Sequence, residues 1–187
     1  MKVIKTKVKD LLILEPRVFG DRRGFFVETY NEERYNEKGV NAKFVQDNLS
    51  KSAKGVLRGL HLQKNPYAQG KLVQVITGSV LDVAVDVRPG SETYGQWESL
   101  LLTGKKKNQF WVPEGFLHGF VSLEDETIFS YKCTNLYHPE SEICVKWNDV
   151  DLNINWQLEK YGIDQPIISE KDQQGIKFAD LIDILKR

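Results

Sequence analysis

Short segments of alternating apolar and polar residues constrain the fold of this chain more than any other feature of its sequence. The clearest is residues 80–87, in which every second residue from Leu81 to Val87 is apolar and two aspartates, Asp82 and Asp86, fall between them. A period of two predicts a β-strand with one apolar face. Comparable runs occur at residues 8–14, 24–30, 43–48, 56–63, 71–77, 98–102, 109–112, 119–123, 127–134 and 142–147.

Turn-forming residues separate many of these runs, as at residues 77–79, 88–91 and 113–115. Many short strands with turns between them are typical of a sandwich or barrel, so we expect an antiparallel double-sheet barrel. Helix signals are few. Asn31 can cap a helix that ends at Gly39, and apolar residues repeat at helical spacing near residues 178–185. The prediction is an all-β fold with a few short peripheral helices.

Length and charge limit the possible functions. A chain of 187 residues suffices for one domain spanning residues 1–187, with a substantial core. Lys plus Arg and Asp plus Glu number 26 each, so no net field favours nucleic acid or an acidic membrane. Lysines interrupt the first apolar residues, which fits neither a secretory signal nor a membrane span. The balanced charge indicates a small-molecule partner. Two cysteines are too few for a disulfide scaffold and indicate a reducing, cytoplasmic setting.

Polar side chains inside strand-like segments indicate a pocket. Gln46 and Asn48 lie in the run 44–48, and His61 lies near the end of the run 55–63. Burying such groups costs free energy unless something hydrogen-bonds to them, and a bound ligand is one natural partner. The alternative for His61 and for His118 is a satisfied imidazole in the core.

Strict alternation would place Arg58 and His61 on opposite faces, because they are three residues apart. Gly59 lies between them. A bulge or a close backbone approach at this glycine would let both side chains reach one pocket.

Three further side chains have two open interpretations each. Lys71 either points into the barrel, where its ammonium could stabilise an oxyanion, or extends along the surface. Tyr131 is either a core aromatic residue or a proton donor. A metal site would need closely spaced ligands, yet His61 is followed by Leu-Gln rather than by a second histidine, so we expect no metal.

In ordered segments over nearly its whole length, the chain resembles the dTDP-4-dehydrorhamnose 3,5-epimerases of deoxysugar biosynthesis. The segments that carry the resemblance are residues 19–28, 44–48, 56–63, 68–73, 82–88, 113–120 and 147–149. The resemblance implies a cupin-like jelly roll that forms a homodimer and uses no metal or organic cofactor. It also implies that the N-terminal segment, with Arg23 and Glu28, reaches into the partner subunit.

The resemblance implies the roles of particular residues. His61 would be the general base, oriented by Asp172, while Tyr131 would be the general acid on the other face of the sugar and Lys71 would stabilise the enolate oxygen. The substrate contacts implied are Arg23, Glu28, Gln46, Asp47, Asn48, Arg58, His118, Tyr137, Glu142 and Lys171. Among these, Tyr137 would stack on the thymine ring.

The implied reaction is inversion of carbons 3 and 5 of dTDP-4-dehydro-6-deoxy-D-glucose, on the route to dTDP-L-rhamnose and cell-surface polysaccharide. A ketone at carbon 4 acidifies the hydrogens on both neighbouring carbons, so an imidazole base and a phenol acid suffice. Two alternatives stay open. One is an epimerase that inverts a single centre of another deoxysugar, since the chain departs from the family pattern at residues 64–67 and at His138. The other is a non-catalytic sugar-nucleotide-binding barrel.

Overall fold

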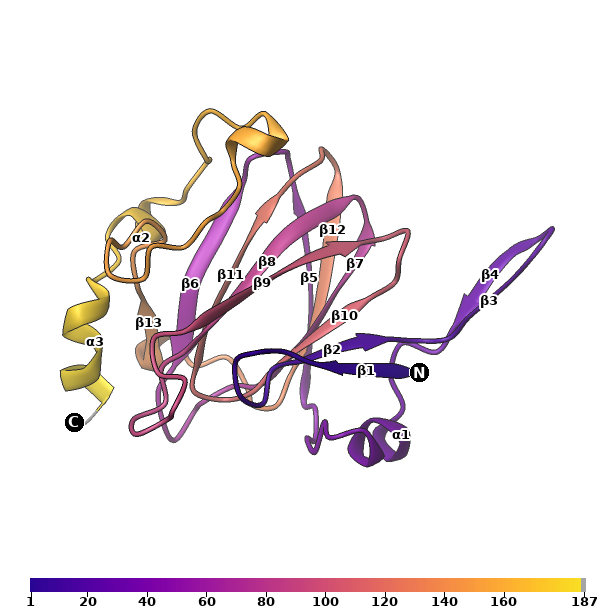
Figure 1. Ribbon diagram of the computed structural model, residues 1–187, viewed down its shortest axis with the longest axis horizontal. Coiled ribbons are helices and arrows are strands. Elements are labelled where there is room, and N and C mark those ends of the chain that lie inside the picture. The colour runs from indigo at the N-terminus through magenta and orange to yellow at the C-terminus, as the bar shows by residue number, and fades with distance from the viewer. Residues whose placement is uncertain (186–187) are drawn as a thin grey trace.

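The computed structural model describes residues 1–185, and its main body is two antiparallel sheets packed face to face (Figure 1). The six-stranded sheet has the order β1 (Lys2–Lys5), β2 (Leu12–Glu15), β10 (Gln109–Val112), β7 (Lys71–Thr77), β12 (Thr127–Cys133) and β5 (Gln46–Ser52). The five-stranded sheet has the order β13 (Glu142–Cys144), β6 (Leu57–Gln63), β11 (Phe116–Ser122), β8 (Ser79–Asp86) and β9 (Trp97–Thr103). The predicted all-β, double-sheet architecture is confirmed.

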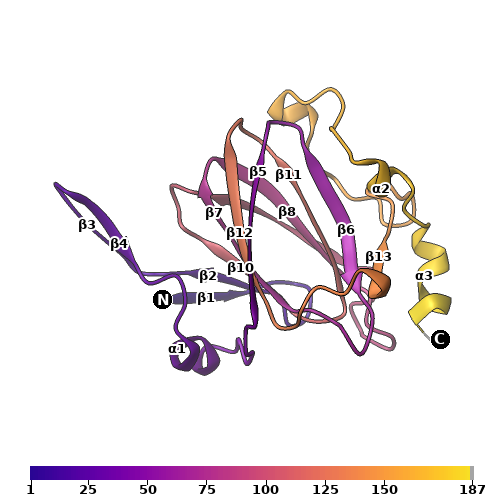
Figure 2. The ribbon, with the colours of Figure 1, turned by 180° about the vertical axis from the view of Figure 1, so that it is seen from behind.

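Three apolar clusters hold this arrangement together. The central one fills part of the space between the sheets and includes Val73 of β7, Ala84 of β8 and Phe129 of β12. A second lies on the outer face of the five-stranded sheet, where the C-terminal segment covers β6, β8 and β11 through residues such as Trp156 and Leu181 (Figure 2). The third packs the segment around α1 (Glu32–Glu37) against the outer face of the six-stranded sheet. Burial of apolar surface in these three clusters is the main stabilising contribution to the fold.

The pattern of β8 differs from the prediction of one apolar face, because all eight of its residues are buried. Leu81, Val83 and Val85 face outward into the cluster covered by the C-terminal segment. The alternate positions, which include Asp82 and Ala84, face the space between the sheets. An aspartate with 0% exposure in the middle of a buried strand must find partners there.

Helices are few and peripheral. Asn31 caps α1, its side chain accepting a hydrogen bond from the Arg34 N–H, and α3 (Phe178–Leu185) forms at the predicted apolar repeat. The short α2 (Glu170–Gln173) and the 3-10 turns Pro139–Ser141 and Glu159–Tyr161 were not predicted. In α2, Ser169 is the N-cap and accepts from the Asp172 N–H. Within residues 1–185 no helix has the length and apolar composition needed to cross a membrane.

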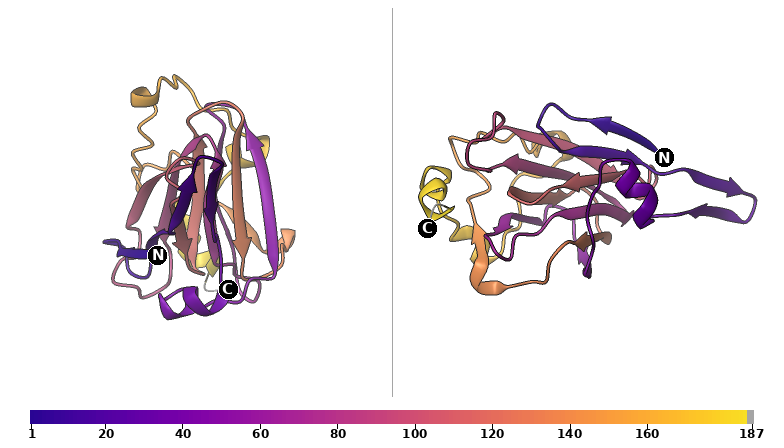
Figure 3. Two further views of the ribbon diagram at one scale, coloured as in Figure 1. Left: turned by 90° about the vertical axis from the view of Figure 1, so that its right-hand side faces the viewer. Right: turned by 90° about the horizontal axis from the view of Figure 1, so that it is seen from below.

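A two-stranded hairpin of β3 (Val18–Asp21) and β4 (Gly24–Val27) extends away from the two sheets as an arm (Figures 1 and 3). Its aromatic side chains are exposed, with Phe25 at 60% and Phe26 at 68%. Arg23 lies in the turn at its tip, where it pairs with Asp21. β1 and β3 were not expected as strands.

Candidate active site

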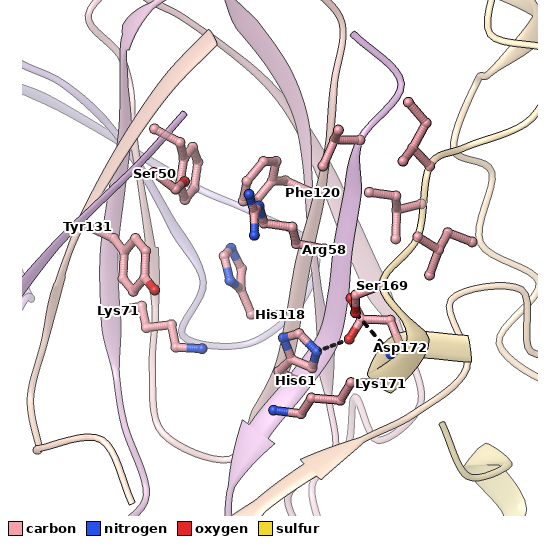
Figure 4. A pocket seen from close by; sticks show the side chains of 15 residues that line it. Ser50, Arg58, His61, Lys71, His118, Phe120, Tyr131, Ser169, Lys171 and Asp172 are labelled. Atoms are coloured by element: carbon pink, nitrogen blue, oxygen red, sulfur yellow. Dashed lines mark hydrogen bonds and ion pairs between the residues drawn. The ribbon is translucent and has the colours of Figure 1, made fainter. Parts of the chain in front are cut away.

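A cavity of about 460 Å³ opens between the two sheets (Figure 4). Its lining includes His61, Tyr131, Lys71 and Asp172, the four residues expected to take part in catalysis. β6 and β11 of the five-stranded sheet supply one wall, and β5, β7 and β12 of the six-stranded sheet supply the other. The cavity is lined by Ser50, Val56, Leu57, Arg58, His61, Lys71, His118, Phe120, Phe129, Tyr131, Ile167, Ile168, Ser169, Lys171 and Asp172.

A bulge at Gly59 brings Arg58 and His61 into this one cavity. On β11, Phe120 and His118 are two residues apart, yet they pair with Arg58 and His61, which are three apart on β6. Because β6 has one extra residue here, both side chains point to the same face of the strand, which strict alternation would not allow. Gly59 has φ +127°, and a Cβ there would lie 2.6 Å from Gly119 Cα, so no larger residue fits. The predicted role of Gly59 is confirmed.

His61 and Asp172 form an imidazole–carboxylate pair. Nε2 of His61 lies 2.6 Å from Oδ1 of Asp172, whose other oxygen accepts from the Gly59 N–H at 3.3 Å. Burial would raise the pKa of Asp172, but the hydrogen bonds to its carboxylate outweigh this and hold that pKa below its usual value. An ionised Asp172 accepts a hydrogen bond from the Nε2–H of His61. The lone pair on Nδ1 is then the one that can accept a proton.

Tyr131 and Lys71 lie on the wall opposite His61 (Figure 4). Lys71 therefore points inward, which decides between its two interpretations. Burial raises the pKa of the Tyr131 phenol, so it stays protonated at neutral pH as a proton donor must. Burial lowers the pKa of the Lys71 ammonium, and the negative charges of Glu142 and Asp82 oppose that shift.

His118 belongs to a second imidazole–carboxylate pair, deeper between the sheets. Its Nε2 lies 2.9 and 3.0 Å from the two carboxylate oxygens of Asp82, and the two residues are 7% and 0% exposed. Burial raises the pKa of Asp82, and the adjacent His118 opposes this. Sequence reasoning missed Asp82 as part of the site, although an aspartate inside an apolar strand was the available signal.

An adjoining cavity of about 280 Å³ shares His61, Lys71 and Tyr131 with the first. Gln46 and Asn48 of β5 line it, and the Gln46 amide oxygen accepts from the Tyr137 N–H at 2.8 Å. The remaining lining residues are Leu62, Gln63, Gln69, Tyr137 and Glu142.

Glu142 links the rims of the two cavities. It accepts from the Tyr137 hydroxyl at 2.9 Å and from the ammonium of Lys171. Burial would raise the pKa of Glu142, but these hydrogen bonds lower it. Lys171 itself lines the first cavity. The structure therefore brings together His61, Asp172, Tyr131, Lys71, Gln46, Asn48, Arg58, His118, Tyr137, Glu142 and Lys171.

Three expected substrate contacts do not reach either cavity. Asp47 is a correction to the sequence analysis: it points to the outer face of β5 because strand residues alternate, and it pairs there with Lys132 at 2.9 Å. Arg23 lies at the tip of the arm, and Glu28 pairs with Arg34 at 2.9 Å. Both lie outside the cavities of their own chain, as the implied contribution to a partner subunit requires.

Cys144 is a further neighbour of the site that the sequence did not indicate. It pairs with His61 across β13 and β6, and its thiol donates to Asp172 Oδ1 at 3.7 Å. Burial and the Asp172 carboxylate raise the pKa of Cys144 to about 12, so the side chain is a neutral thiol at neutral pH. His61, Cys144 and Asp172 form the one group of potential metal ligands found within residues 1–185.

A base and a proton donor on facing walls of one cavity are the groups that an isomerase needs to invert a carbon centre. The sequence model of the dTDP-4-dehydrorhamnose 3,5-epimerases matches residues 5–180. The chain belongs to this family.

Individual relatives are similar over nearly their whole length. The dTDP-4-dehydrorhamnose 3,5-epimerase of Shigella flexneri is 51% identical, with 96% of this chain and 97% of that protein covered. The enzyme of that name from Methanothermobacter thermautotrophicus is also 51% identical, with 92% and 91% covered. A crystal structure of dTDP-6-deoxy-D-glucose-3,5-epimerase from Legionella pneumophila, in complex with dTDP-4-keto-L-rhamnose, is 47% identical with a TM-score of 0.93, covering 98% and 96%.

Proposed function

We propose that this protein is an isomerase that inverts carbons 3 and 5 of dTDP-4-dehydro-6-deoxy-D-glucose to give dTDP-4-dehydro-L-rhamnose. The observation that carries the proposal is the placement of His61 and Tyr131 on opposite walls of one cavity, with Lys71 beside Tyr131. Inversion at a carbon requires a base on one face and an acid on the other.

The first step is removal of a proton from carbon 3 or carbon 5 by Nδ1 of His61. Asp172 holds the Nε2–H at 2.6 Å and stabilises the imidazolium as it forms. The electron pair left by the proton moves onto the carbon 4 oxygen, giving an enolate. Lys71 lies where its ammonium can stabilise that negative charge, and a half-buried cation does this better than one in water.

The second step returns a proton to the opposite face of the carbon from the Tyr131 hydroxyl. Its raised pKa keeps the proton available, and the enolate is basic enough to accept it as the ketone re-forms. His61 then releases its proton to solvent and the Tyr131 phenolate takes one up, after which the same pair of groups serves the second carbon.

The nucleotide contacts side chains of both cavities. Gln46 and Asn48 offer amide groups, and Arg58 and Lys171 offer positive charge for the pyrophosphate. Tyr137 is 51% exposed and provides a ring on which the thymine can stack.

Proton NMR in heavy water tests this function. We expect deuterium at carbons 3 and 5 and a product with both centres inverted when the purified protein acts on dTDP-4-dehydro-6-deoxy-D-glucose. Inversion at one carbon alone would replace the proposal by the single-centre epimerase. Binding of the nucleotide sugar without any exchange would replace it by a non-catalytic barrel.

We further propose that the protein works as a homodimer. The arm presents Phe19, Phe25 and Phe26 at 51–68% exposure, and exposed apolar side chains gathered in one place are typical of an interaction surface. Arg23 at its tip is a substrate contact by family pattern yet lies outside the cavities of its own chain. When the arm packs against a partner subunit, its aromatic side chains become buried, and Arg23 and Glu28 lie at the partner's active site.

The setting that fits the chain is the cytoplasm. Cys133 and Cys144 are both free thiols, as is usual in a reducing compartment.

A further inference from the structure

Cys144 lies against the His61–Asp172 pair and has no role in the proposed reaction. Three elements, β6, β13 and α2, bring these three residues together, and one ligand atom from each residue lies within 4.8 Å of the other two. Nε2 of His61 is 2.6 Å and Sγ of Cys144 is 3.7 Å from the same oxygen, Asp172 Oδ1. One nitrogen, one sulfur and one oxygen are therefore gathered in one place, with the nitrogen and the sulfur both next to the same oxygen.

The two separations that involve Asp172 Oδ1 can be compared with those around a tetrahedral divalent cation. Zinc bonds of about 2.0 Å to nitrogen and oxygen and about 2.3 Å to sulfur place the nitrogen and oxygen about 3.3 Å apart and the sulfur and oxygen about 3.5 Å apart. The sulfur is already near that distance from the oxygen. The imidazole and the carboxylate need to separate by well under an ångström, and water can supply the fourth ligand.

We propose that these three side chains form a binding site for a thiophilic divalent cation such as Zn²⁺, and that the cation inhibits the enzyme. The inhibitory part rests on the proposed function, whereas the binding part does not. A sulfur ligand selects soft or borderline cations over Mg²⁺ and Ca²⁺, which prefer oxygen.

Inhibition follows from the tautomer of His61. In the structure Nε2 faces Asp172, so Nε2 carries the proton and Nδ1 is free to act as base. A cation on Nε2 moves the ring proton to Nδ1, where Glu142 Oε1 lies 4.0 Å away. The basic lone pair is then blocked. On binding, the thiol releases one proton to solvent, the sulfur–metal bond forms, and no group is oxidised or reduced.

Cobalt spectroscopy tests the binding. We expect the reduced, full-length protein titrated with Co²⁺ to show a thiolate-to-cobalt charge-transfer band that Zn²⁺ abolishes. Cys144→Ser should lose that band and weaken the affinity for the cation by on the order of 10- to 100-fold. Cys133→Ser is the matched control, because Cys133 is the only other cysteine of the chain and lies on the opposite sheet, paired with Lys71.

A band that survives in Cys144→Ser, or one that disappears in Cys133→Ser, would overturn the site. Absence of any band in the wild-type protein would do the same.

Deuterium exchange tests the inhibition, each variant being scored against its own rate without metal. We expect Zn²⁺ to abolish exchange at both carbons in the wild-type protein, a chelator to restore it, and Cys144→Ala to need on the order of 10-fold more Zn²⁺ for the same effect. Equal sensitivity of the wild type and Cys144→Ala would overturn inhibition through this site. If the protein proves not to catalyse exchange at all, the cobalt band still decides whether the cation site exists.

Discussion

The site contains two histidines with carboxylate partners, and the surroundings of the two imidazoles indicate different roles. His118 and Asp82 are almost fully buried, and both oxygens of Asp82 are directed at one ring nitrogen, which suits a fixed imidazole that positions the substrate. The side chain of His61 is 23% exposed and lies where the two cavities meet. A base must reach a substrate, so the more accessible imidazole is the one we expect to transfer protons.

Variants at the two facing walls should separate the two halves of the reaction. We expect His61→Asn to slow deuterium exchange by on the order of 10²- to 10⁴-fold at both carbons while dTDP binding by calorimetry stays near normal. Tyr131→Phe should retain exchange and lose inversion, because the phenol acts only when the proton returns. Near-normal exchange in His61→Asn would show that His61 is not the base. An equal loss of exchange and inversion in Tyr131→Phe would show that Tyr131 is not the proton donor.

Asp86 should control the stability of the protein in acid. Burial alone would raise its pKa, but hydrogen bonds from Arg88, Ser91 and Thr93 lower it to about 2. Because the folded-state pKa lies below the unfolded one, this stabilisation is complete above about pH 4 and is lost as the pH falls toward 2.

We expect Asp86→Asn to destabilise the protein by about 3 kcal/mol at pH 7 in urea unfolding, with a smaller loss of stability between pH 4 and pH 2 than in the wild type. The exposed Asp151→Asn serves as the control, and its unfolding curve should match the wild type at each pH. An Asp86→Asn protein that loses as much stability in acid as the wild type would contradict this assignment.

At the scale of elements, the close pairing of β6 with β11 depends on Gly59. A Cβ at Gly59 would lie 2.6 Å from Gly119 Cα and 2.9 Å from the His118 carbonyl oxygen, so β6 and β11 would have to separate. We expect Gly59→Ala to cost about 2–4 kcal/mol of stability and to lower turnover further by turning His61 away from the cavity.

Gly90→Ala is the matched control for that change. Gly90 also has a positive φ, of +80°, but no atom lies within 4 Å of the place that a Cβ would occupy, so only the backbone cost of about 1–2 kcal/mol applies. If the two variants were equally stable and equally active, close packing at Gly59 would not be what shapes the site.

Element by element, the sequence predicted what local periodicity controls. β7 and β10 begin and end where the alternation does, and α1 begins after its Asn31 cap. β1 and β3 were missed because each is a four-residue strand whose pairing partner, rather than its own pattern, makes it a strand.

At the scale of the whole molecule, the proposed homodimer would combine residues of two chains in each active site. Arg23→Ala and His61→Asn should each be nearly inactive alone. When the two variant chains are co-expressed with different tags and purified as mixed dimers, we expect activity to return, since one of the two sites then combines an intact His61 with the partner's intact arm. Random mixing without selection should give about one quarter of the wild-type activity per protomer.

Mixed dimers without activity would show that each arm serves its own chain. A Phe25→Ser and Phe26→Ser double variant is the companion test, and sedimentation should find it monomeric at concentrations at which the wild type is dimeric. A wild-type protein that sediments as a monomer would overturn the homodimer itself.

The sequence by itself determined most of the strands, the barrel class and most of the residues of the site, because alternation, turn chemistry and the ordered family segments are all local. Tertiary structure alone decided that Lys71 points inward, that Asp47 points out, and that Asp82 and Cys144 belong beside the two imidazoles. These outcomes depend on which face of a strand meets which neighbour. That is set by pairing between segments far apart in the chain, as when β13 brings Cys144 opposite His61.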